Sequence, residues 1–346
     1  MKILITGGLG FIGSAVCRRL IQTTDHQVLV YDAHTYAAQK EALEEGSRSD
    51  RLEIVKGDIR DLDDVRGALL RFQPDLVMHL AAESHVDRSI EAPGDFITTN
   101  VLGTFTVLQA VRAYYEVLET NRKAEFRFHH ISTDEVYGSL RLGDPAFSET
   151  NRYDPRSPYS ASKAASDHLV SAWQHTFGLP TLTTNCSNNY GPWQYPEKLI
   201  PLMISKGIRG EPMPVYGQGL NRRDWLHVDD HAEALMLVAS KGIVGGTYNI
   251  GGEAEYTNLD VVNAICSVLD KRFPDRAPHD RLITFVEDRP GHDFRYAIDA
   301  SRLQRELGWR PSRKFHEGLL STVDWYLDHP EHLKHQDAIK RRGKLS

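Results

Sequence analysis

Gly7-Gly8-Leu9-Gly10-Phe11-Ile12-Gly13 is the stretch that decides the fold of this 346-residue chain. It follows the apolar run Lys2–Thr6, which predicts a buried strand, and it opens the run Phe11–Gln22, which predicts a helix. Glycines in such a strand-to-helix turn let the backbone approach a pyrophosphate closely, and the helix N-terminus faces its charge. The sequence therefore predicts a dinucleotide site formed by Gly7, Gly10, Phe11, Ile12 and Gly13.

Short apolar runs alternate with helical patterns along the first half of the chain. The further predicted strands are Gln27–Tyr31, Leu52–Val55, Leu76–Leu80, Phe126–Ser132 and Thr181–Cys186. The further predicted helices are Leu62–Arg71, Phe96–Leu118 and Ala161–Phe177. This alternation favours right-handed crossovers and therefore an α/β fold with a Rossmann-type, doubly wound parallel sheet. Continuous apolar runs indicate strands that are covered on both faces.

The composition of the chain changes after Asn185. Pro and Gly become more frequent there, which predicts loops with short strands. The alternation of helix and strand patterns seen in the first half then resumes, with a helical pattern over His231–Ser240 and a strand pattern over Thr247–Ile250. We expect residues 1–186 to form an NAD-binding Rossmann domain, to which 226–250 return. A smaller C-terminal α/β substrate-binding domain would comprise 187–225 and 251–330, where Asn258–Leu269 reads as a helix. Residues 331–346 would be a tail.

The composition argues against several classes of partner. The formal net charge is −6, which disfavours binding to nucleic acid or to anionic membranes. No apolar run approaches the roughly 18 residues that a membrane helix needs, and the first residues do not resemble a signal peptide. The cysteines, Cys17, Cys186 and Cys266, are far apart, which predicts free thiols and a cytoplasmic protein.

One pair of histidines has a spacing that could bind zinc. His227 and His231 stand at i and i+4 with carboxylates between them. The helix is expected to begin near Asp229, which would leave His227 outside it. We therefore expect no metal site.

Asp32 ends the second predicted strand and points to the type of dinucleotide. A carboxylate there can accept hydrogen bonds from the adenosine ribose and would repel the extra phosphate of NADP. No Arg or Lys stands beside it in Tyr31-Asp32-Ala33-His34, so NAD is favoured, although a turn Asp is an alternative. Strand ends that face the same crevice could line the adenine and phosphates, or could simply be strand caps. They are Asp58, Ile59, Leu80, Ala81 and Ala82.

Tyr159 and Lys163 are the predicted centre of an oxidation. They stand at i and i+4 of a predicted helix and so share a face. An ammonium lowers the pKa of a nearby phenol, and a phenolate can take a proton from an alcohol while a hydride leaves its carbon. Another Tyr-x-x-x-Lys, Tyr36 to Lys40, is interpreted as coincidental. The helix of Tyr159 follows the fifth strand, which Thr133 ends.

Asp134 and Glu135 follow Thr133 directly, and two adjacent carboxyls could move protons at the carbons next to an oxidised one. They could instead cap a short helix, with their charges at its positive end. Neighbouring residues on a strand point to opposite faces, so both carboxyls can face one substrate only if the chain leaves β geometry here. Together with Tyr159 and Lys163, they predict an enzyme that oxidises an alcohol and eliminates water.

The motifs together resemble the dTDP-glucose 4,6-dehydratase family, within the extended short-chain dehydrogenase/reductases, from Met1 to about Tyr326. Besides the glycine motif, the resemblance is carried by Ala82-Glu83-Ser84-His85-Val86-Asp87-Arg88-Ser89, Thr133-Asp134-Glu135-Val136-Tyr137-Gly138, Tyr159-Ser160-Ala161-Ser162-Lys163-Ala164, Ser187-Asn188-Asn189-Tyr190-Gly191-Pro192 and Asp288-Arg289-Pro290-Gly291-His292-Asp293. Such long blocks are more specific than either short motif alone.

The resemblance implies a role for each residue of the predicted centre. Thr133 would hold the O4 hydroxyl of the sugar, and Tyr159 would take its proton as the C4 hydride passes to NAD⁺. Glu135 would remove the C5 proton and Asp134 would protonate the C6 hydroxyl, which leaves as water. Hydride would then return to C6. The product would be dTDP-4-dehydro-6-deoxy-glucose, a precursor of rhamnose-type deoxysugars.

The resemblance also implies binding residues and an assembly. Thr35, Thr99 and Asn189 would approach the cofactor, and Ser84 the sugar. The nucleotide of dTDP-glucose would meet Asn188, Lys198, Leu199, Pro214, Tyr216, Arg223, Asn258, Arg289 and His292. The two arginines suit phosphate oxygens, although each alone could form a surface ion pair. We expect a homodimer in which Phe96–Leu118 and Ala161–Phe177 pack as a four-helix interface.

Some positions depart from the pattern that is usual in the family. Ala33 stands where a Lys is common, Ala38-Gln39 where Gly-Asn is common, Leu9 where Ala is frequent, and Trp193 where Tyr is frequent. None of them touches the predicted chemistry, but the contacts on the adenosine side depend on them.

Other functions on the same fold stay open at this point. A UDP-galactose 4-epimerase would need no acid–base pair at C5 and C6, so Asp134 and Glu135 argue against it. In the GDP-mannose 4,6-dehydratases, the corresponding motif resembles Thr-Ser-Glu, with Ser at the position of Asp134. A UDP-sugar 4,6-dehydratase differs in the base by a methyl group and in the sugar by a hydroxyl. A catalytically inactive NAD-binding sensor or scaffold is disfavoured because Tyr159, Lys163 and both acids are present.

Overall fold

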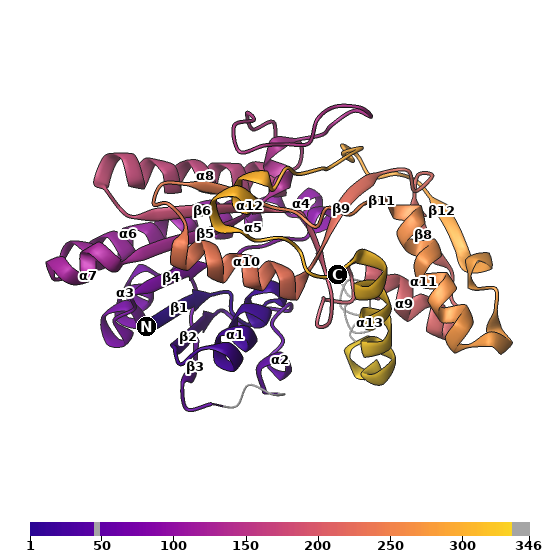
Figure 1. Ribbon diagram of the computed structural model, residues 1–346, viewed down its shortest axis with the longest axis horizontal. Coiled ribbons are helices and arrows are strands. Elements are labelled where there is room, and N and C mark those ends of the chain that lie inside the picture. The colour runs from indigo at the N-terminus through magenta and orange to yellow at the C-terminus, as the bar shows by residue number, and fades with distance from the viewer. Residues whose placement is uncertain (45–48, 334–346) are drawn as a thin grey trace.

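A parallel sheet of seven strands forms the centre of the molecule, and the computed structural model describes residues 1–44 and 49–333 (Figure 1). Its strand order is β10-β6-β5-β4-β1-β2-β3, and every neighbouring pair is parallel. The strands are β1 (Lys2–Thr6), β2 (Gln27–Asp32), β3 (Leu52–Lys56), β4 (Leu76–His79), β5 (Arg127–Thr133), β6 (Thr181–Cys186) and β10 (Thr247–Ile250). The order reverses between β1 and β4, which is where such sheets open a ligand crevice.

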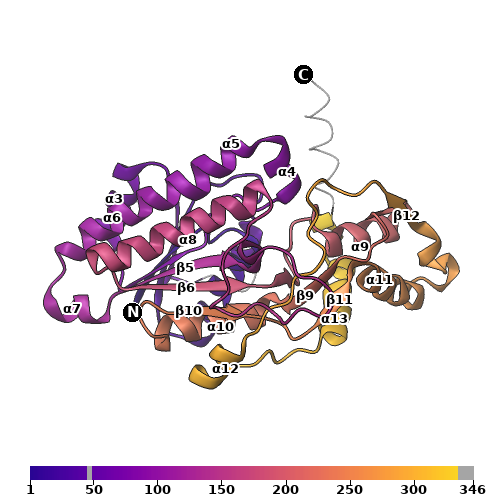
Figure 2. The same ribbon diagram turned by 90° about the horizontal axis from the view of Figure 1, so that it is seen from above.

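Successive side chains of the central strands enter two different cores, which explains why these strands are apolar throughout. Ile3 and Ile5 of β1 pack in one cluster, and Leu4 between them packs in the other. The first cluster is closed by α1 (Phe11–Thr23), α10 (Val228–Lys241) and α12 (Ser301–Leu307). The second is closed by α3 (Leu62–Phe72), α6 (Thr104–Glu116) and α8 (Pro158–Phe177). Figure 2 shows α6 and α8 side by side on one face of the sheet and α10 on the other.

A smaller unit lies beyond the carboxyl ends of the central strands (Figure 1). It contains a three-stranded sheet of β7 (Asn188–Tyr190), β9 (Arg222–His227) and β11 (Glu255–Thr257), and a parallel pair of β8 (Met213–Tyr216) and β12 (Ile283–Val286). Three helices, α9 (Leu199–Arg209), α11 (Asn258–Arg272) and α13 (Phe315–Asp328), enclose its own apolar core. The predicted α/β class with a doubly wound parallel sheet is confirmed.

The remaining helices are short. They are α2 (Glu41–Glu44), α4 (Val86–Glu91), α5 (Pro93–Phe96), α7 (Thr120–Glu125), the π-helix η1 (Ile97–Gly103) and the 3-10 helices η2 (Asp134–Tyr137), η3 (Pro274–Arg276), η4 (His279–Leu282) and η5 (Pro330–Leu333). No helix among the described residues is long and apolar enough to cross a membrane. The predicted tail, 331–346, lies outside the described residues from 334 onward.

Two predicted helices differ from the structure for local reasons. The predicted helix Phe96–Leu118 is interrupted by η1, where the backbone widens to π geometry before α6 begins at Thr104. The helix predicted from Ala161 begins earlier, at Pro158, because Ser157 and Ser160 form a reciprocal capping box and Pro158 suits the first turn. The capping box places Tyr159 in the first turn of α8.

Candidate active site

The turn between β1 and α1 forms the floor of a deep cavity. Gly7 has a φ of 71°, and a Cβ at this position would stand 2.6 Å from the backbone nitrogen of Ala81. A Cβ on Gly13 would collide with the carbonyl oxygen of Gly7. Only glycine therefore fits this turn, which brings bare backbone and the N-terminus of α1 to the ends of β1 and β4.

Asp32 ends β2 beside this turn. Its carboxylate accepts hydrogen bonds from the backbone nitrogens of Leu9 at 3.0 Å and His34 at 2.8 Å. These bonds fix the orientation of the carboxylate at the rim of the turn, where ribose hydroxyls of a dinucleotide would lie. Asp58, in contrast, is tied to Arg60, whose guanidinium lies 2.6 Å from it and lowers the pKa of the carboxyl.

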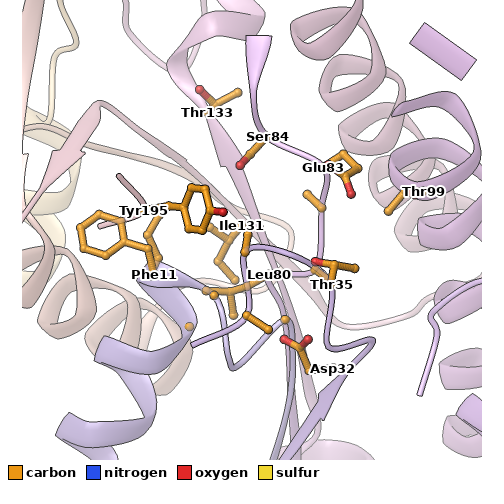
Figure 3. A pocket seen from close by; sticks show the side chains of 18 of the residues that line it. Phe11, Asp32, Thr35, Leu80, Glu83, Ser84, Thr99, Ile131, Thr133 and Tyr195 are labelled. Atoms are coloured by element: carbon orange, nitrogen blue, oxygen red, sulfur yellow. The ribbon is translucent and has the colours of Figure 1, made fainter. Parts of the chain in front are cut away.

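The cavity has a volume of about 580 Å³, within the range of small-molecule sites. Asp32 and Thr35 lie toward one end of it, and Ser84 and Thr133 toward the other (Figure 3). It is lined by all the residues predicted to bind the cofactor and by all those predicted to be catalytic, namely Gly7, Gly10, Phe11, Ile12, Gly13, Asp32, Thr35, Asp58, Ile59, Leu80, Ala81, Ala82, Thr99, Thr133, Asp134, Glu135, Tyr159, Lys163 and Asn189.

The chain leaves β geometry directly after Thr133. Asp134 to Tyr137 form the 3-10 helix η2, and the Thr133 hydroxyl caps it by accepting from the backbone nitrogen of Glu135 at 3.3 Å. The turn brings both carboxyls into the wall of one cavity, as two adjacent acids on a strand could not be. Capping and chemistry are therefore compatible at this site.

The two acids lie in different electrostatic surroundings. Burial raises the pKa of Asp134 well above its ordinary value, and the negative charges of Glu135 and Asp224 raise it further. Burial also raises the pKa of Glu135, but three cationic side chains, Arg223, Lys198 and Arg289, oppose this effect. Asp134 is therefore held as the neutral acid, while Glu135 keeps its negative charge more readily.

Tyr159 and Lys163 are both buried on the face of α8 that meets the cavity. Burial raises the pKa of Tyr159 well above its ordinary value, and the Thr133 hydroxyl opposes this rise. The expected lowering by Lys163 is not found, and the negative charge of Glu135 adds to the rise instead. The ammonium of Lys163 donates to the carbonyl oxygen of Ile131 at 2.9 Å, and burial lowers its pKa.

The residues predicted to bind the substrate divide into two groups. Ser84, Asn188 and Lys198 line the cavity, and the Lys198 ammonium donates to the Ser84 carbonyl at 3.1 Å. The lining does not include Leu199, Pro214, Tyr216, Arg223, Asn258, Arg289 and His292.

Several members of the second group nevertheless form one cluster on the smaller unit. Arg289 lies 3.3 Å from Asp87 and 5.0 Å from the ring centre of Tyr216. His292 packs edge-on against the same ring and approaches Asp288 at 2.6 Å. This cluster joins α4, which carries Asp87, to the end of β8 and the loop after β12.

Comparison with known proteins agrees with this geometry. The family model described as GDP-mannose 4,6 dehydratase matches residues 4–322. The dTDP-glucose 4,6-dehydratase of Neisseria meningitidis serogroup B is 55% identical over 331 residues, which are 94% of this chain and 93% of the relative. The chain belongs to the dTDP-glucose 4,6-dehydratase family. The predicted resemblance is thereby confirmed.

Further relatives show how far the likeness extends. The dTDP-glucose 4,6-dehydratase 1 of Escherichia coli K12 is 53% identical over 94% of this chain and 93% of its own. The solved dTDP-glucose 4,6-dehydratase of Streptomyces venezuelae with NAD and TYD bound is 40% identical, with a TM-score of 0.89 over 97% of this chain and 99% of that one. The UDP-glucose 4-epimerase of Thermus thermophilus in complex with NAD is 29% identical, with a TM-score of 0.82 over 94% and 99%. The fold is thus shared with epimerases, and the identity is higher with dehydratases.

The contacts between two loops that meet over the cavity were not predicted, although Thr35 of the first loop was predicted to approach the cofactor. Gln39 donates from Nε2 to the carbonyl oxygen of Trp193 at 2.8 Å. Tyr36 packs edge-on against Tyr195, with ring centres 5.4 Å apart, and its hydroxyl donates to Glu197 at 3.4 Å. Gln39 and Trp193 are two of the positions at which the chain departs from the usual family pattern, and this was the signal available in the sequence.

The histidine pair with zinc-like spacing has another role. His227 is the N-cap of α10 and accepts from the backbone nitrogen of Asp229 at 3.2 Å. His231 is fully buried, and its Nδ1 lies 2.8 Å from Oδ1 of Asn189. Within residues 1–44 and 49–333, no group of three or more His, Cys, Asp or Glu side chains is placed to hold a metal ion.

Proposed function

We propose that this protein is an NAD-dependent hydro-lyase that converts dTDP-glucose to dTDP-4-dehydro-6-deoxy-glucose and water. The observation that carries the proposal is the contrast between Asp134 and Glu135 in the cavity that also holds Tyr159 and Lys163. An alcohol oxidation at C4 needs only the second pair, whereas elimination across C5 and C6 needs an acid and a base as well. The dTDP-glucose 4,6-dehydratases named above carry the same activity in their names.

The cavity fits a dinucleotide at the end nearest the glycine turn. Bare backbone at Gly7 and Gly13 and the N-terminus of α1 suit a pyrophosphate, and the carboxylate of Asp32 suits ribose hydroxyls. The chain has no Arg or Lys next to Asp32 that would receive the phosphate of NADP. NAD held there would supply the acceptor for the C4 hydride and the donor of that hydride to C6.

The first step depends on Thr133, Tyr159 and Lys163. Tyr159 would take the proton of the C4 hydroxyl, which Thr133 would hold in place by a hydrogen bond. Because burial raises the pKa of Tyr159, its deprotonation requires nearby positive charge. Lys163, one turn away on α8, would supply that charge.

The second step depends on the two acids of η2. A C4 ketone acidifies the C5 proton, and Glu135, which Arg223 and Lys198 help to keep ionised, would remove it. Asp134 is held neutral and would donate its proton to the C6 hydroxyl, which leaves as water. The larger rise at Asp134 and the cations around Glu135 thus favour Asp134 as the proton donor and Glu135 as the acceptor.

The nucleotide would bind on the smaller unit. Arg223 and Arg289 would meet the pyrophosphate, where a guanidinium suits phosphate oxygens. The remaining predicted contacts would come from Asn188, Lys198, Leu199, Asn258 and His292, with Pro214 and Tyr216 near the thymine. We also propose a Rossmann domain of 1–186 with 226–250 and a substrate domain of 187–225 with 251–330, from which α12 returns to the core of the central sheet.

We also propose a cytoplasmic homodimer. Large apolar side chains are exposed on the surface formed by η1, α6 and α8, at Ile97, Leu102, Phe105 and Phe177. Four exposed apolar residues on neighbouring helices fit a two-fold helical interface. All the cysteines of the chain are free and buried, which fits a reducing compartment.

A labelled substrate tests the reaction. dTDP-glucose with deuterium at C4 would be incubated with the purified protein without added NAD, and the product examined by mass spectrometry. Loss of one water with deuterium retained at C6 is expected, because the hydride returns within one site. An unchanged mass with the C4 epimer formed would instead identify an epimerase. Turnover of UDP-glucose but not dTDP-glucose would reassign the nucleotide.

A further inference from the structure

Asp167 is a buried carboxylate to which the proposed reaction gives no role. It lies on α8, two turns beyond Tyr159 and one beyond Lys163, so all three share a face of the helix. Three side chains donate to it: His130 Nε2 at 2.9 Å, Ser132 Oγ at 2.8 Å and the Tyr153 hydroxyl at 3.0 Å. The side chain is about 3% exposed, so these bonds hold a desolvated charge.

The three bonds join the two parts of the catalytic centre. His130 and Ser132 alternate along β5 and therefore point to the same face, toward α8. Thr133 follows Ser132 directly, and η2 with both acids follows Thr133. Lys163 binds the carbonyl oxygen of Ile131, between the same two residues. Asp167 thus fixes the register between the helix of the Tyr–Lys pair and the strand end that carries the acids.

The charge of Asp167 also faces Lys163. Burial lowers the pKa of Lys163, and the Asp167 carboxylate opposes that effect. The imidazole of His130, from β5, and that of His79, stacked on it from β4, have pKa values that burial lowers, so both are neutral at neutral pH.

Three further titratable groups near Asp167 and Lys163 are uncharged at neutral pH. Tyr137 of η2 and Tyr153 have pKa values that burial raises, and Asp167 raises both further. Burial likewise raises the pKa of the Cys186 thiol on β6, which faces Lys163. Lys163 is therefore the cation that the Asp167 charge supports.

We propose that Asp167 is a positioning residue that keeps Lys163 charged and holds Thr133, Asp134 and Glu135 in register with Tyr159. The inference rests on the proposed function, because it assigns Asp167 to the same reaction. It acts through Lys163 and β5 and does not touch the sugar or the cofactor.

The test compares Asp167→Asn with Asp230→Asn. Asp230 is equally buried and accepts four hydrogen bonds from Ser312 and Arg313, away from the cavity. For Asp167→Asn we expect kcat to fall about 10–100-fold with little change in KM, since misplaced catalytic groups cost on that order. Without the carboxylate the charged form of Lys163 is less favoured, so the alkaline limb of the kcat profile should move to lower pH. Asp230→Asn should lower stability and leave the profile in place.

Two milder variants keep the proposal testable if Asp167→Asn does not fold. Ser132→Ala and Tyr153→Phe each remove one hydrogen bond and keep the charge, so kcat should fall several-fold with the alkaline limb unmoved. Wild-type kcat in both, or a wild-type kcat and pH profile in Asp167→Asn, would overturn the proposal.

A readout without turnover separates this inference from the proposed function. The protonation of Lys163 can be followed by NMR of ¹³Cε-labelled lysine, with Lys163→Arg for assignment. Asp167→Asn should lower the pKa of Lys163, and an unchanged titration would overturn the electrostatic role. A wild-type protein that leaves dTDP-glucose unchanged would contradict the proposed function, while this titration would still report on Asp167.

Discussion

Asp134 and Glu135 are neighbours on one 3-10 turn, yet the balance of charge around them differs. Arg223 acts on both, but Asp134 lies near the acidic Glu135 and Asp224, whereas Lys198 and Arg289 also act on Glu135 and offset its acidic neighbour Asp293. In the proposed reaction, this turn would therefore present a proton donor and a proton acceptor to adjacent carbons of the sugar.

Replacing the proposed base should separate oxidation from elimination. In Glu135→Gln, Tyr159 and Lys163 are untouched, so oxidation at C4 should continue while removal of the C5 proton slows by about 10²–10⁴. Rapid-quench mass spectrometry with C4-deuterated dTDP-glucose would show label transferred to the cofactor before water is lost. Full dehydratase turnover in this variant would contradict the role of Glu135.

Replacing the proposed proton acceptor of the first step should stop the reaction earlier. Tyr159→Phe keeps the ring that packs against Phe96 at 6.3 Å but removes the hydroxyl. Formation of reduced cofactor on mixing with dTDP-glucose, followed by absorbance, should fall by about 10²–10⁴. An unchanged rate would mean that another group accepts the O4 proton.

Replacing Asp134 with Asn should stabilise the protein but impair catalysis. The folded pKa of Asp134 lies above its ordinary value of 3.8, so folding takes up a proton at this site and stability falls as pH rises above that value. Asp134→Asn has no such proton to take up. It should gain about 0.5–2 kcal/mol, the usual range for stabilising substitutions, and the gain should grow from pH 4 toward neutrality.

Urea denaturation of wild type and Asp134→Asn at several pH values measures this gain. An equal difference at every pH would show that Asp134 does not titrate abnormally. A loss of stability would show that its carboxyl makes favourable contacts in the folded protein.

The elements of the central sheet could be predicted because their signals are local. Apolar runs such as Lys2–Thr6 are buried on both faces, and the turn after β1 has no room for a side chain at its glycines. The charge asymmetry of η2 could not be predicted, because Arg223 and Lys198 reach Glu135 from distant segments of the smaller unit. The π-helix Ile97–Gly103 has no composition signal that separates it from an α-helix.

The site was predicted where motifs are contiguous and missed where contacts are long-range. Asp167 stands four residues after Lys163 in the sequence. Its contacts with His130 and Ser132 could not be predicted, because they depend on how α8 packs on β5. The residues outside the cavity that are predicted to bind the nucleotide, such as Asn258 and Pro214, were inferred from family resemblance alone, because a single Asn or Pro has no pattern of its own.

A charge on the exposed apolar surface should dissociate the proposed dimer. Phe105 on α6 is 40% exposed and packs edge-on against Trp173 of α8. Phe105→Glu would bury an unpaired carboxylate in a two-fold interface and should yield a monomer in light scattering. Leu320→Glu on α13, where Leu320 is 42% exposed, is the control and should leave the mass unchanged. A monomeric wild type would remove the proposal.

The contact between Gln39 and Trp193 should help to retain the cofactor. It joins the loop after β2 to the loop after β7 over the cavity, and the Tyr36–Tyr195 contact lies beside it. Gln39→Ala removes the side-chain bond but keeps the backbone bond from Gln39 to Leu9. The loss of one hydrogen bond of about 1 kcal/mol should speed NAD dissociation roughly fivefold, measured by dilution and NAD assay of the retained protein. Gln22→Ala on the exposed face of α1 is the matched control. If both variants release NAD at the wild-type rate, the two loops do not hold the cofactor, and its retention depends on the floor of the cavity alone.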